Sequence, residues 1–251
     1  LREQVVVEDA ASARHHAAML THHVFESRRL GNRRSLWHLP LGEAAADARP
    51  LVVFLDAEYY LDRMQALELL SASHAEGRLP ACDDVFLSHL DAVTRWQDYM
   101  CSALFAESVA RELPRFLRSD LGIADEALKI IGGLSLSGLA AAHASWSAPD
   151  VYSRAFAQSG SFWWSDEFLT DQIAGSPRPT VQFSLTCGLD ETEAPVDHGS
   201  GLIQRVSQID ASRRFRDTLE RTGHTVRYTE HPGGHTIEAW RHQLIPTLKP
   251  L

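Results

Sequence analysis

Residues 128–146, with the sequence LKIIGGLSLSGLAAAHASW, decide the fold of this chain. Residues 128–133 are apolar or glycine apart from one lysine, which is typical of a strand covered on both faces. A turn of small residues follows, and the alanine-rich run after it predicts a helix over 136–147. The stretch therefore predicts a strand, a tight turn and a helix in direct succession, with Ser135 at the apex of the turn.

The rest of the chain repeats this alternation of short β-rich runs and longer helical stretches. The other expected strands are Arg34–His38, Leu51–Asp56, Val85–Leu90, Arg154–Gln158, Val181–Cys187 and Thr225–Glu230. The other expected helices are Tyr59–Ser73, Ser102–Arg118, Gly201–Thr222 and Ile237–Leu248. Repeated strand–helix–strand units indicate an α/β fold with a mostly parallel central sheet and helices on both faces. Since no linker-like tract interrupts the chain, we expect a single domain over residues 1–251.

The composition excludes several classes of protein. Hydrophobic residues make up 44% of the 251 positions, which excludes a disordered chain, and the net charge of −9 argues against nucleic-acid binding. No apolar run approaches the roughly 18 residues of a membrane span, so no membrane partner is expected. The first residues lack a signal-peptide pattern, and the three cysteines lack CxxC spacing and favour a reducing compartment. We therefore expect a cytoplasmic protein, whose first residue is not Met and leaves room for a segment upstream.

A serine, two carboxylates and a histidine follow predicted strands in turn. Ser135 lies in a sequence close to G-x-S-x-G, the nucleophile elbow, in which a strained turn exposes a serine before a helix. Asp190 and Glu191 follow a later strand, and His235 follows the last one. Because the carboxyl ends of parallel strands meet at one edge of a sheet, these groups are expected to gather there. Serine, acid and histidine in this order are typical of α/β-hydrolases, and either carboxylate remains a candidate for the acid.

Such a set is suited to nucleophilic catalysis. The imidazole of His235 would take the proton from the hydroxyl of Ser135, while the carboxylate would hold the imidazole in the required tautomer. Ser137 is a competing nucleophile, but Ser135 fits better because Gly133 lies two residues before it. The sequence thus predicts a hydrolase with a serine nucleophile that needs no cofactor and no metal.

Six motifs, in order from about Ser27 to Trp240, also give the chain a resemblance to a known family. They are SRRLGNRRSLWHLP at 27–40, LVVFLDAEYY at 51–60, RWQDYMC at 95–101 with Phe105 and Glu112-Leu113, the elbow at 132–139, SGSFWW at 159–164, and GGH at 233–235 with Trp240-Arg241. On these motifs the chain resembles the putative-esterase branch of the α/β-hydrolases, and within it the enterochelin (enterobactin) esterases. The resemblance implies the α/β-hydrolase fold and a serine esterase that forms an acyl-serine intermediate. The implied substrates are small-molecule esters, either siderophore esters or, alternatively, general short-chain or aromatic-acyl esters.

The resemblance further implies a role for each matched residue of the catalytic set. Ser135 would be the nucleophile and His235 the general base. Glu191, three residues after Gly188, occupies the usual position of the acid, with Asp190 as the alternative.

The same resemblance implies an oxyanion hole and a substrate pocket. The backbone N–H groups of Leu136 and Glu58 would form the oxyanion hole. Arg95, Trp163 and Trp164 would line an acyl or aryl pocket, since aromatic side chains suit flat acyl groups; the two tryptophans could equally belong to the core.

The chain departs from the family pattern at four positions. Ala57 and Ser137 replace glycines, Ser102 replaces an asparagine, and Thr236 replaces an aspartate. We expect the turn around Ser137 to survive with slightly more crowding.

Two further hypotheses belong to other classes of function. A chain with an altered elbow could have kept the fold as a non-catalytic binding protein. A metal-dependent hydrolase could instead use the paired histidines His15-His16 and His22-His23, although a solvated face or surface loop is the simpler interpretation. Cys101 is interpreted as a small buried residue rather than a nucleophile.

Overall fold

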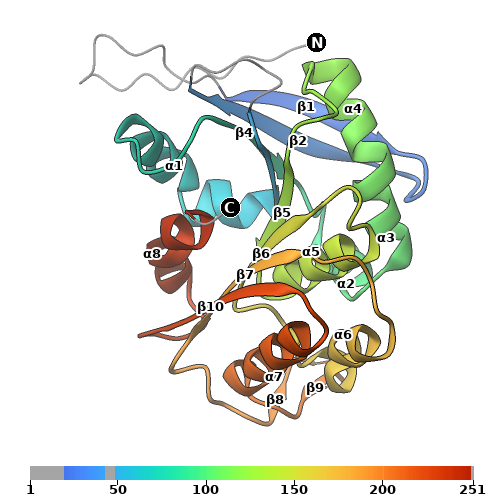
Figure 1. Cartoon of the computed structure of the whole chain (residues 1–251), viewed down its shortest axis with the longest axis vertical. Helices are drawn as coiled ribbons and strands as arrows, with labels where there is room; N and C mark the ends of the chain where they lie inside the picture. Colours follow the sequence, from blue (N-terminus) through green and yellow to red (C-terminus); the bar gives the residue numbers. More distant parts are fainter. Residues whose placement is uncertain (1–19, 43–48, 200, 250–251) are drawn as a thin grey trace.

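A twisted eight-stranded sheet forms the centre of the computed structural model, which describes residues 20–42, 49–199 and 201–249 (Figure 1). Its strands are β1 Thr21–Ser27, β2 Asn32–Leu41, β3 Leu51–Leu55, β4 Cys82–Leu87, β5 Lys129–Leu134, β6 Arg154–Gln158, β7 Gln182–Gly188 and β10 Thr225–His231. Their order in space is β1-β2-β4-β3-β5-β6-β7-β10. Strand β2 pairs antiparallel with β1 and β4, and every other neighbouring pair is parallel, so the predicted mostly parallel sheet is confirmed.

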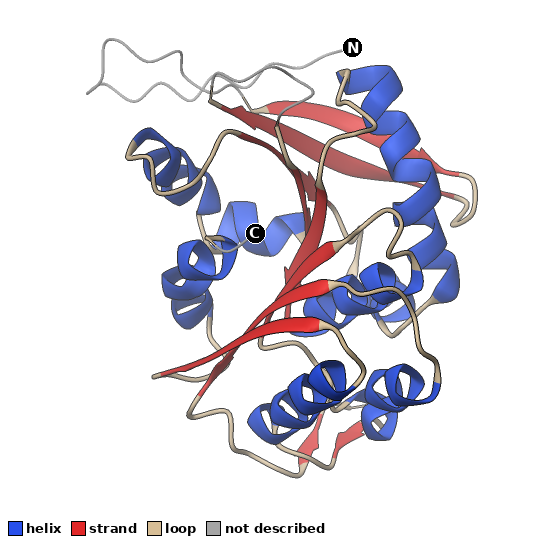
Figure 2. Ribbon diagram, in the orientation of Figure 1, coloured by secondary structure: helices blue, strands red, loops and turns tan. Residues whose placement is uncertain are grey.

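Helices cover both faces of this sheet (Figure 2). They are α1 Ala66–Ala75, α2 Ala92–Tyr99, α3 Ala103–Glu107, α4 Leu113–Leu121, α5 Ser135–Ser147, α6 Trp164–Gly175, α7 Gln208–Arg221 and α8 Ile237–Leu248. Two single wider helical turns, Tyr59–Arg63 and Ser108–Glu112, and a short hairpin of β8 Val196–Asp197 and β9 Ile203–Gln204 complete the described elements. Helices α1 and α8 lie on one face, and α2 to α7 lie on the other (Figure 1).

The strands hold two hydrophobic layers together because their side chains point alternately to the two faces. In β3 all five residues are buried; Val53 packs in the layer beneath α5, and Phe54 packs in the layer beneath α1 and α8. Phe54 stacks on Phe86 with ring centroids 4.7 Å apart. Burying a side chain of this size stabilises the fold by about 1.5–3 kcal/mol. Because a shifted strand would lose this burial, the register is fixed, and so are the positions of the residues that follow each strand.

Some expected elements differ from those observed. Strand β1 was not predicted, because its sequence THHVFES buries only two residues and reads as polar. Helices α2 and α6 were also missed, and the strand expected to reach Leu90 ends at Leu87. The helix expected from Gly201 begins only at Gln208, where the Ser207 side chain caps it by accepting from the N–H of Asp210.

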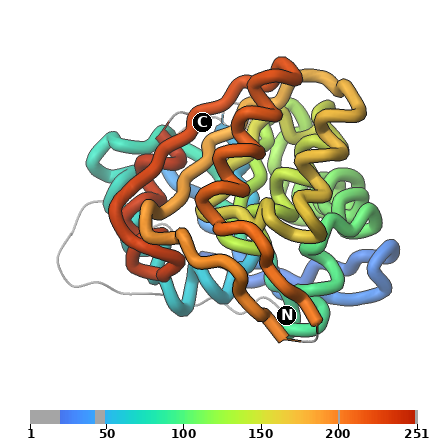
Figure 3. Tube along the Cα trace, turned by 90° about the horizontal axis from the view of Figure 1, so that it is seen from below, coloured from blue at the N-terminus to red at the C-terminus, as the bar shows by residue number. Residues whose placement is uncertain are grey.

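This topology brings the carboxyl ends of four neighbouring strands to one edge. Strands β5, β6, β7 and β10 are consecutive neighbours and parallel, so the residues that follow them lie side by side. The pairing of β7 with β10 is visible as adjacent orange and red segments in Figure 3. Among the residues that the structure describes, no helix combines the length and the apolar character needed to cross a membrane.

Candidate active site

The turn between β5 and α5 is strained in the way that an elbow requires. Ser135, the first residue of α5, has φ 52°, a left-handed conformation that is costly for a residue other than glycine. At Gly133 a Cβ atom would stand only 2.5 Å from the backbone carbon of Ser137, so only glycine allows this close passage. The geometry therefore presents the hydroxyl of a half-buried Ser135 at the sheet edge.

Ser137 closes this turn and is not presented to a substrate. Its hydroxyl accepts from the N–H of Leu134 at 3.0 Å and donates to the carbonyl of Leu134 at 2.7 Å. The side chain is fully buried, which removes Ser137 as a competing nucleophile. The glycine-to-serine departure is thus accommodated by two hydrogen bonds within the turn.

Ser135, His235 and Glu191 form one chain of hydrogen bonds. His235 Nε2 lies 2.9 Å from Ser135 Oγ, and His235 Nδ1 lies 2.6 Å from Glu191 Oε2. An ionised carboxylate can only accept, so Nδ1 carries the proton and Nε2 can accept the proton of the serine. The imidazole is 41% exposed whereas the Glu191 side chain is 1% exposed, so the base faces solvent and the acid faces the protein.

The carboxylate of Glu191 is stabilised as an anion. Its burial alone would raise the pKa, but His235 and the hydrogen bonds from Ser159 and the Gly188 N–H outweigh it and lower the pKa below its usual value. The neighbouring Asp190 is exposed, and its backbone N–H donates to the carbonyl of Gly233 at 3.0 Å. Of the two carboxylates left open by the sequence, Glu191 is therefore the one that contacts His235.

Contacts between two loops place the acid and the histidine together. At Gly188, the last residue of β7, a Cβ atom would collide with the carbonyl oxygen of Gly233, so the end of β7 and the loop after β10 touch through glycine. Beyond His235, Thr236 caps α8: its hydroxyl accepts from the N–H of Ala239 at 3.2 Å. An aspartate would cap a helix in the same way, so this departure from the family pattern preserves the local structure.

The two N–H groups predicted for an oxyanion hole lie after neighbouring strands. Leu136 is in the first turn of α5, where backbone N–H groups have no partner within the helix. Glu58 lies after β3, which pairs with β5. The left-handed residue of the β3 turn is Asp56, with φ 69°, so Ala57 meets no strain from the absence of glycine.

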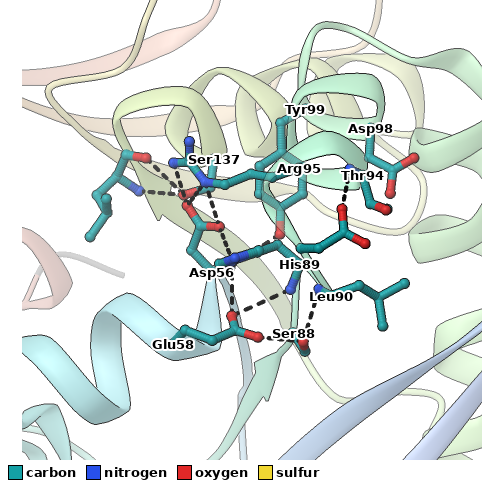
Figure 4. A network of polar contacts seen from close by, with 12 residues as sticks. Asp56, Glu58, Ser88, His89, Leu90, Thr94, Arg95, Asp98, Tyr99 and Ser137 are labelled. Atoms are coloured by element: carbon teal, nitrogen blue, oxygen red, sulfur yellow. Dashed lines mark hydrogen bonds and ion pairs between the residues drawn. The ribbon is translucent and has the colours of Figure 1, made fainter.

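A network of charges surrounds the β3 turn (Figure 4). Arg95 Nη2 lies 2.7 Å from Asp56 Oδ2, and His89 Nδ1 lies 2.9 Å from both Asp56 Oδ1 and Glu58 Oε2. Partial burial would lower the pKa of His89, but the two carboxylates raise it to about 9. Burial would likewise raise the pKa of Glu58, but His89 and Ser88 lower it to about 2. Two cations and two anions thus anchor the turn that carries the Glu58 N–H.

Arg95 is engaged in this network, and its side chain is 13% exposed. Besides its bidentate contact with Asp56, its guanidinium lies 5.1 Å and 5.8 Å from the ring centres of Tyr59 and Tyr99. The sequence alone assigned no role to Asp56, although it lies in the motif at 51–60, and gave no signal for His89, which lies outside the motifs.

The two tryptophans have different surroundings. Trp163 is 5% exposed, belongs to the hydrophobic core and stacks on His198, with ring centroids 4.7 Å apart and the ring planes nearly parallel. Trp164 is half-buried against Phe168. Ser161, two residues before Trp163, reaches the elbow: its N–H donates to the carbonyl of Ser135 at 3.0 Å.

The remaining candidates have structural surroundings. His22 and His23 lie in strand β1, where neighbouring side chains face opposite sides, and His15 and His16 lie outside the described residues. No group of three or more potential metal ligands occurs within the described ranges. Burial raises the pKa of the Cys101 thiol to about 12, and Ser102 caps α3 through the N–H of Phe105.

Comparisons with known proteins identify the family of the chain. The model of a family described as "Putative esterase" matches residues 27–251. An iron(III) enterobactin esterase from Dickeya dadantii is 30% identical over 234 residues, which cover 91% of this chain and 54% of that protein. One from Escherichia coli K12 is 30% identical over 142 residues, 56% of this chain and 36% of that protein. The chain thus spans only about half the length of the first of these relatives, and less of the second.

Solved structures share the fold. An enterobactin esterase from Shigella flexneri, crystallised in the presence of enterobactin, superposes with a TM-score of 0.79 at 24% identity, covering 92% of this chain and 58% of that one. An IroE-like serine hydrolase from Shewanella oneidensis superposes with a TM-score of 0.73 at 18% identity, covering 92% and 79%. Together with the sheet order, these neighbours confirm the predicted α/β-hydrolase fold.

Proposed function

The chain belongs to the putative esterase family, and from that membership we propose that it is a serine carboxylic-ester hydrolase acting through an acyl-serine intermediate. The single observation that carries the proposal is the hydrogen-bonded chain from Ser135 through His235 to Glu191, with contacts of 2.9 and 2.6 Å. Nucleophile, base and orienting acid are thereby at working distance without rearrangement.

The proposed reaction proceeds in two halves. His235 Nε2 takes the proton of Ser135 as Oγ bonds to the ester carbonyl carbon, and the carbonyl oxygen becomes an oxyanion. The N–H groups of Leu136 and Glu58 are the proposed donors to this oxyanion; removing one such donor typically costs about a hundredfold to a thousandfold in turnover. The protonated imidazole then gives its proton to the departing alcohol, leaving an acyl-serine.

Water completes the cycle. His235 deprotonates a water molecule that attacks the acyl carbon, and the imidazolium returns the proton to Ser135 Oγ as the carboxylic acid departs. Throughout, Glu191 stays ionised and stabilises each imidazolium. Its lowered pKa is consistent with this role.

For the substrate, we propose an ester siderophore of the enterobactin class. The support is the similarity to two curated proteins named iron(III) enterobactin esterase, together with the family motifs around residues 159–164 and 233–241. The bound iron would arrive as part of the substrate and not as a cofactor of the protein.

The test compares Ser135→Ala with wild type on p-nitrophenyl butyrate and on enterobactin, with release of dihydroxybenzoyl-serine followed by chromatography. Ser145→Ala is the matched control, because that serine lies in the same helix and its hydroxyl donates only locally, to Ala142 O at 3.1 Å. We expect Ser135→Ala to lose at least about a thousandfold in kcat on both substrates and Ser145→Ala to keep activity. Full activity of Ser135→Ala would refute the proposal, and hydrolysis of butyrate alone would refute the siderophore substrate.

A further inference from the structure

The acid of this site is held by a second layer of side chains that the reaction scheme does not use. We propose that Ser159 and Trp240 are positioning residues, which act together to keep the Glu191 carboxylate ionised and aimed at His235. The inference rests on the proposed function, because it assigns a role in the same catalytic set.

The direction of each hydrogen bond in this layer is fixed by chemistry. Ser159 Oγ lies 2.6 Å from Glu191 Oε1, and Trp240 Nε1 lies 3.0 Å from Ser159 Oγ. An indole N–H can only donate, and an ionised carboxylate can only accept. The hydroxyl of Ser159 must therefore accept from Trp240 and donate to Glu191. Donation from the indole polarises the hydroxyl and strengthens its bond to the carboxylate.

The backbone holds both residues in place. Ser159 follows β6 in a left-handed conformation, with φ 48°, and its N–H donates to Thr186 O at 2.7 Å. Its carbonyl accepts from Gln208 Nε2 at 2.6 Å, and the carbonyl of Trp240 accepts from Gln158 Nε2 at 2.7 Å. A strained conformation retained by so many partners is typical of a position with a functional role.

Trp240 also contacts the histidine directly. Its ring meets the imidazole of His235 edge to face, with centroids 4.7 Å apart and planes at 83°. One indole therefore supports both members of the acid–base pair, the acid through a hydroxyl and the base through its ring. Ser159 is fully buried and Trp240 is 4% exposed, so water cannot readily replace either contact.

Loss of the Ser159 hydroxyl has a defined electrostatic consequence. Glu191 Oε1 would lose its donor at 2.6 Å and keep the Gly188 N–H at 2.8 Å. A carboxylate with fewer donors attracts the shared proton more strongly and favours the imidazolium form of His235. The acid limb of the pH–rate profile should then move to higher pH, in addition to any loss of rate. A residue needed only for folding would lower the rate equally at every pH.

Two variants and two matched controls test this. Ser159→Ala removes the central hydroxyl, and Trp240→Phe keeps an aromatic ring but removes the N–H. Ser184→Ala removes an equally buried hydroxyl that donates to Thr247 O at 2.8 Å, away from the site. Trp146→Phe removes a buried indole N–H that has no acceptor among the described residues.

We expect Ser159→Ala to lose about ten- to a hundredfold in kcat and to shift the acid limb upward by about half a pH unit. Trp240→Phe should shift it in the same direction by less, and the double variant should shift no further than Ser159→Ala, because both changes act through one oxygen atom. The proton between His235 Nδ1 and Glu191 should move further downfield in the NMR spectrum of Ser159→Ala. The two controls should leave the limb and the resonance unchanged.

An unshifted acid limb and an unmoved resonance in folded Ser159→Ala would overturn the proposal. If that variant does not fold, Trp240→Phe decides by the same two readouts. Ser135→Ala, assayed alongside, distinguishes failure of the positioning role from failure of the proposed function. If Ser135→Ala remains active, the proposed function fails. If Ser135→Ala is inactive and Ser159→Ala behaves as wild type, only the positioning role fails.

Discussion

Replacing Glu191 by glutamine should be far more damaging than replacing its neighbour Asp190 by asparagine. The amide of Glu191→Gln has one accepting oxygen and one donating nitrogen, whereas the carboxylate it replaces accepts on both oxygens. Ser159 and the Gly188 N–H donate to one oxygen at 2.6 and 2.8 Å, and His235 Nδ1 contacts the other at 2.6 Å. An amide cannot accept on both sides.

Either orientation of the amide carries a cost. With its nitrogen toward Ser159, two buried donors face it without an acceptor. With its nitrogen toward His235, the imidazole must accept on Nδ1 and carry its proton on Nε2, where it can no longer receive the proton of Ser135. Loss of a hydrogen bond to a charged group costs about 1.5–3 kcal/mol, which corresponds to about ten- to a hundredfold. The wrong tautomer raises the loss to about a thousandfold or more.

The assay is kcat on p-nitrophenyl butyrate for Glu191→Gln, Asp190→Asn and wild type, with folding checked by circular dichroism. Asp190 is exposed, so Asp190→Asn should stay within about twofold of wild type. A larger loss in Asp190→Asn than in Glu191→Gln would refute this assignment of the acid.

Three further predictions concern the turns that surround the site. The folded state raises the pKa of His89 from 6.5 to about 9, so protonated His89 stabilises the fold fully below pH 6.5 and this stabilisation is lost as the pH rises through about 9. The free energy of unfolding, measured with urea from pH 6 to 10, should fall with pH in wild type and change less in His89→Gln. Equal pH dependence in the two proteins would contradict this prediction. Ser137→Ala removes the hydroxyl that bonds both the N–H and the carbonyl of Leu134, and should lower the free energy of unfolding by about 1–3 kcal/mol. Esterase activity should remain, in contrast to the result of replacing the nucleophile. Arg95→Met removes one of the two cations beside the fully buried Asp56 and should destabilise the fold by about 3 kcal/mol, measured by thermal or urea unfolding; an unchanged midpoint would show that His89 alone compensates that carboxylate.

Elements with a strong local signal could be predicted from the sequence. Strand Arg154–Gln158 and helix Ile237–Leu248 have the expected bounds, because an apolar run and a helical pattern each end at clear turn residues. Strand β1 escaped prediction because its stability comes from pairing with β2 and not from its own apolar residues. Helix α2 escaped because a single capping residue, Asp91, and packing against α5 decide it.

In the candidate site, too, local features could be predicted from the sequence and long-range contacts could not. The elbow is a local feature, so Ser135 could be identified from its immediate neighbours. The choice between Asp190 and Glu191 could not be made from the sequence, since adjacent side chains in a turn point in different directions that depend on the loop after β10. Trp240 lies 81 residues from Ser159 along the chain, and only the sheet order brings them together.

The most direct test of the central claim is a mass measurement on the wild-type protein. After brief reaction with a slowly hydrolysed p-nitrophenyl ester, acid quenching and trypsin digestion, Ser135 falls in the peptide of residues 130–154. The account predicts that this peptide gains the mass of the acyl group and that fragmentation assigns it to Ser135. Continued ester hydrolysis with the acyl group on another residue, or with no acylated peptide at any time, would contradict it.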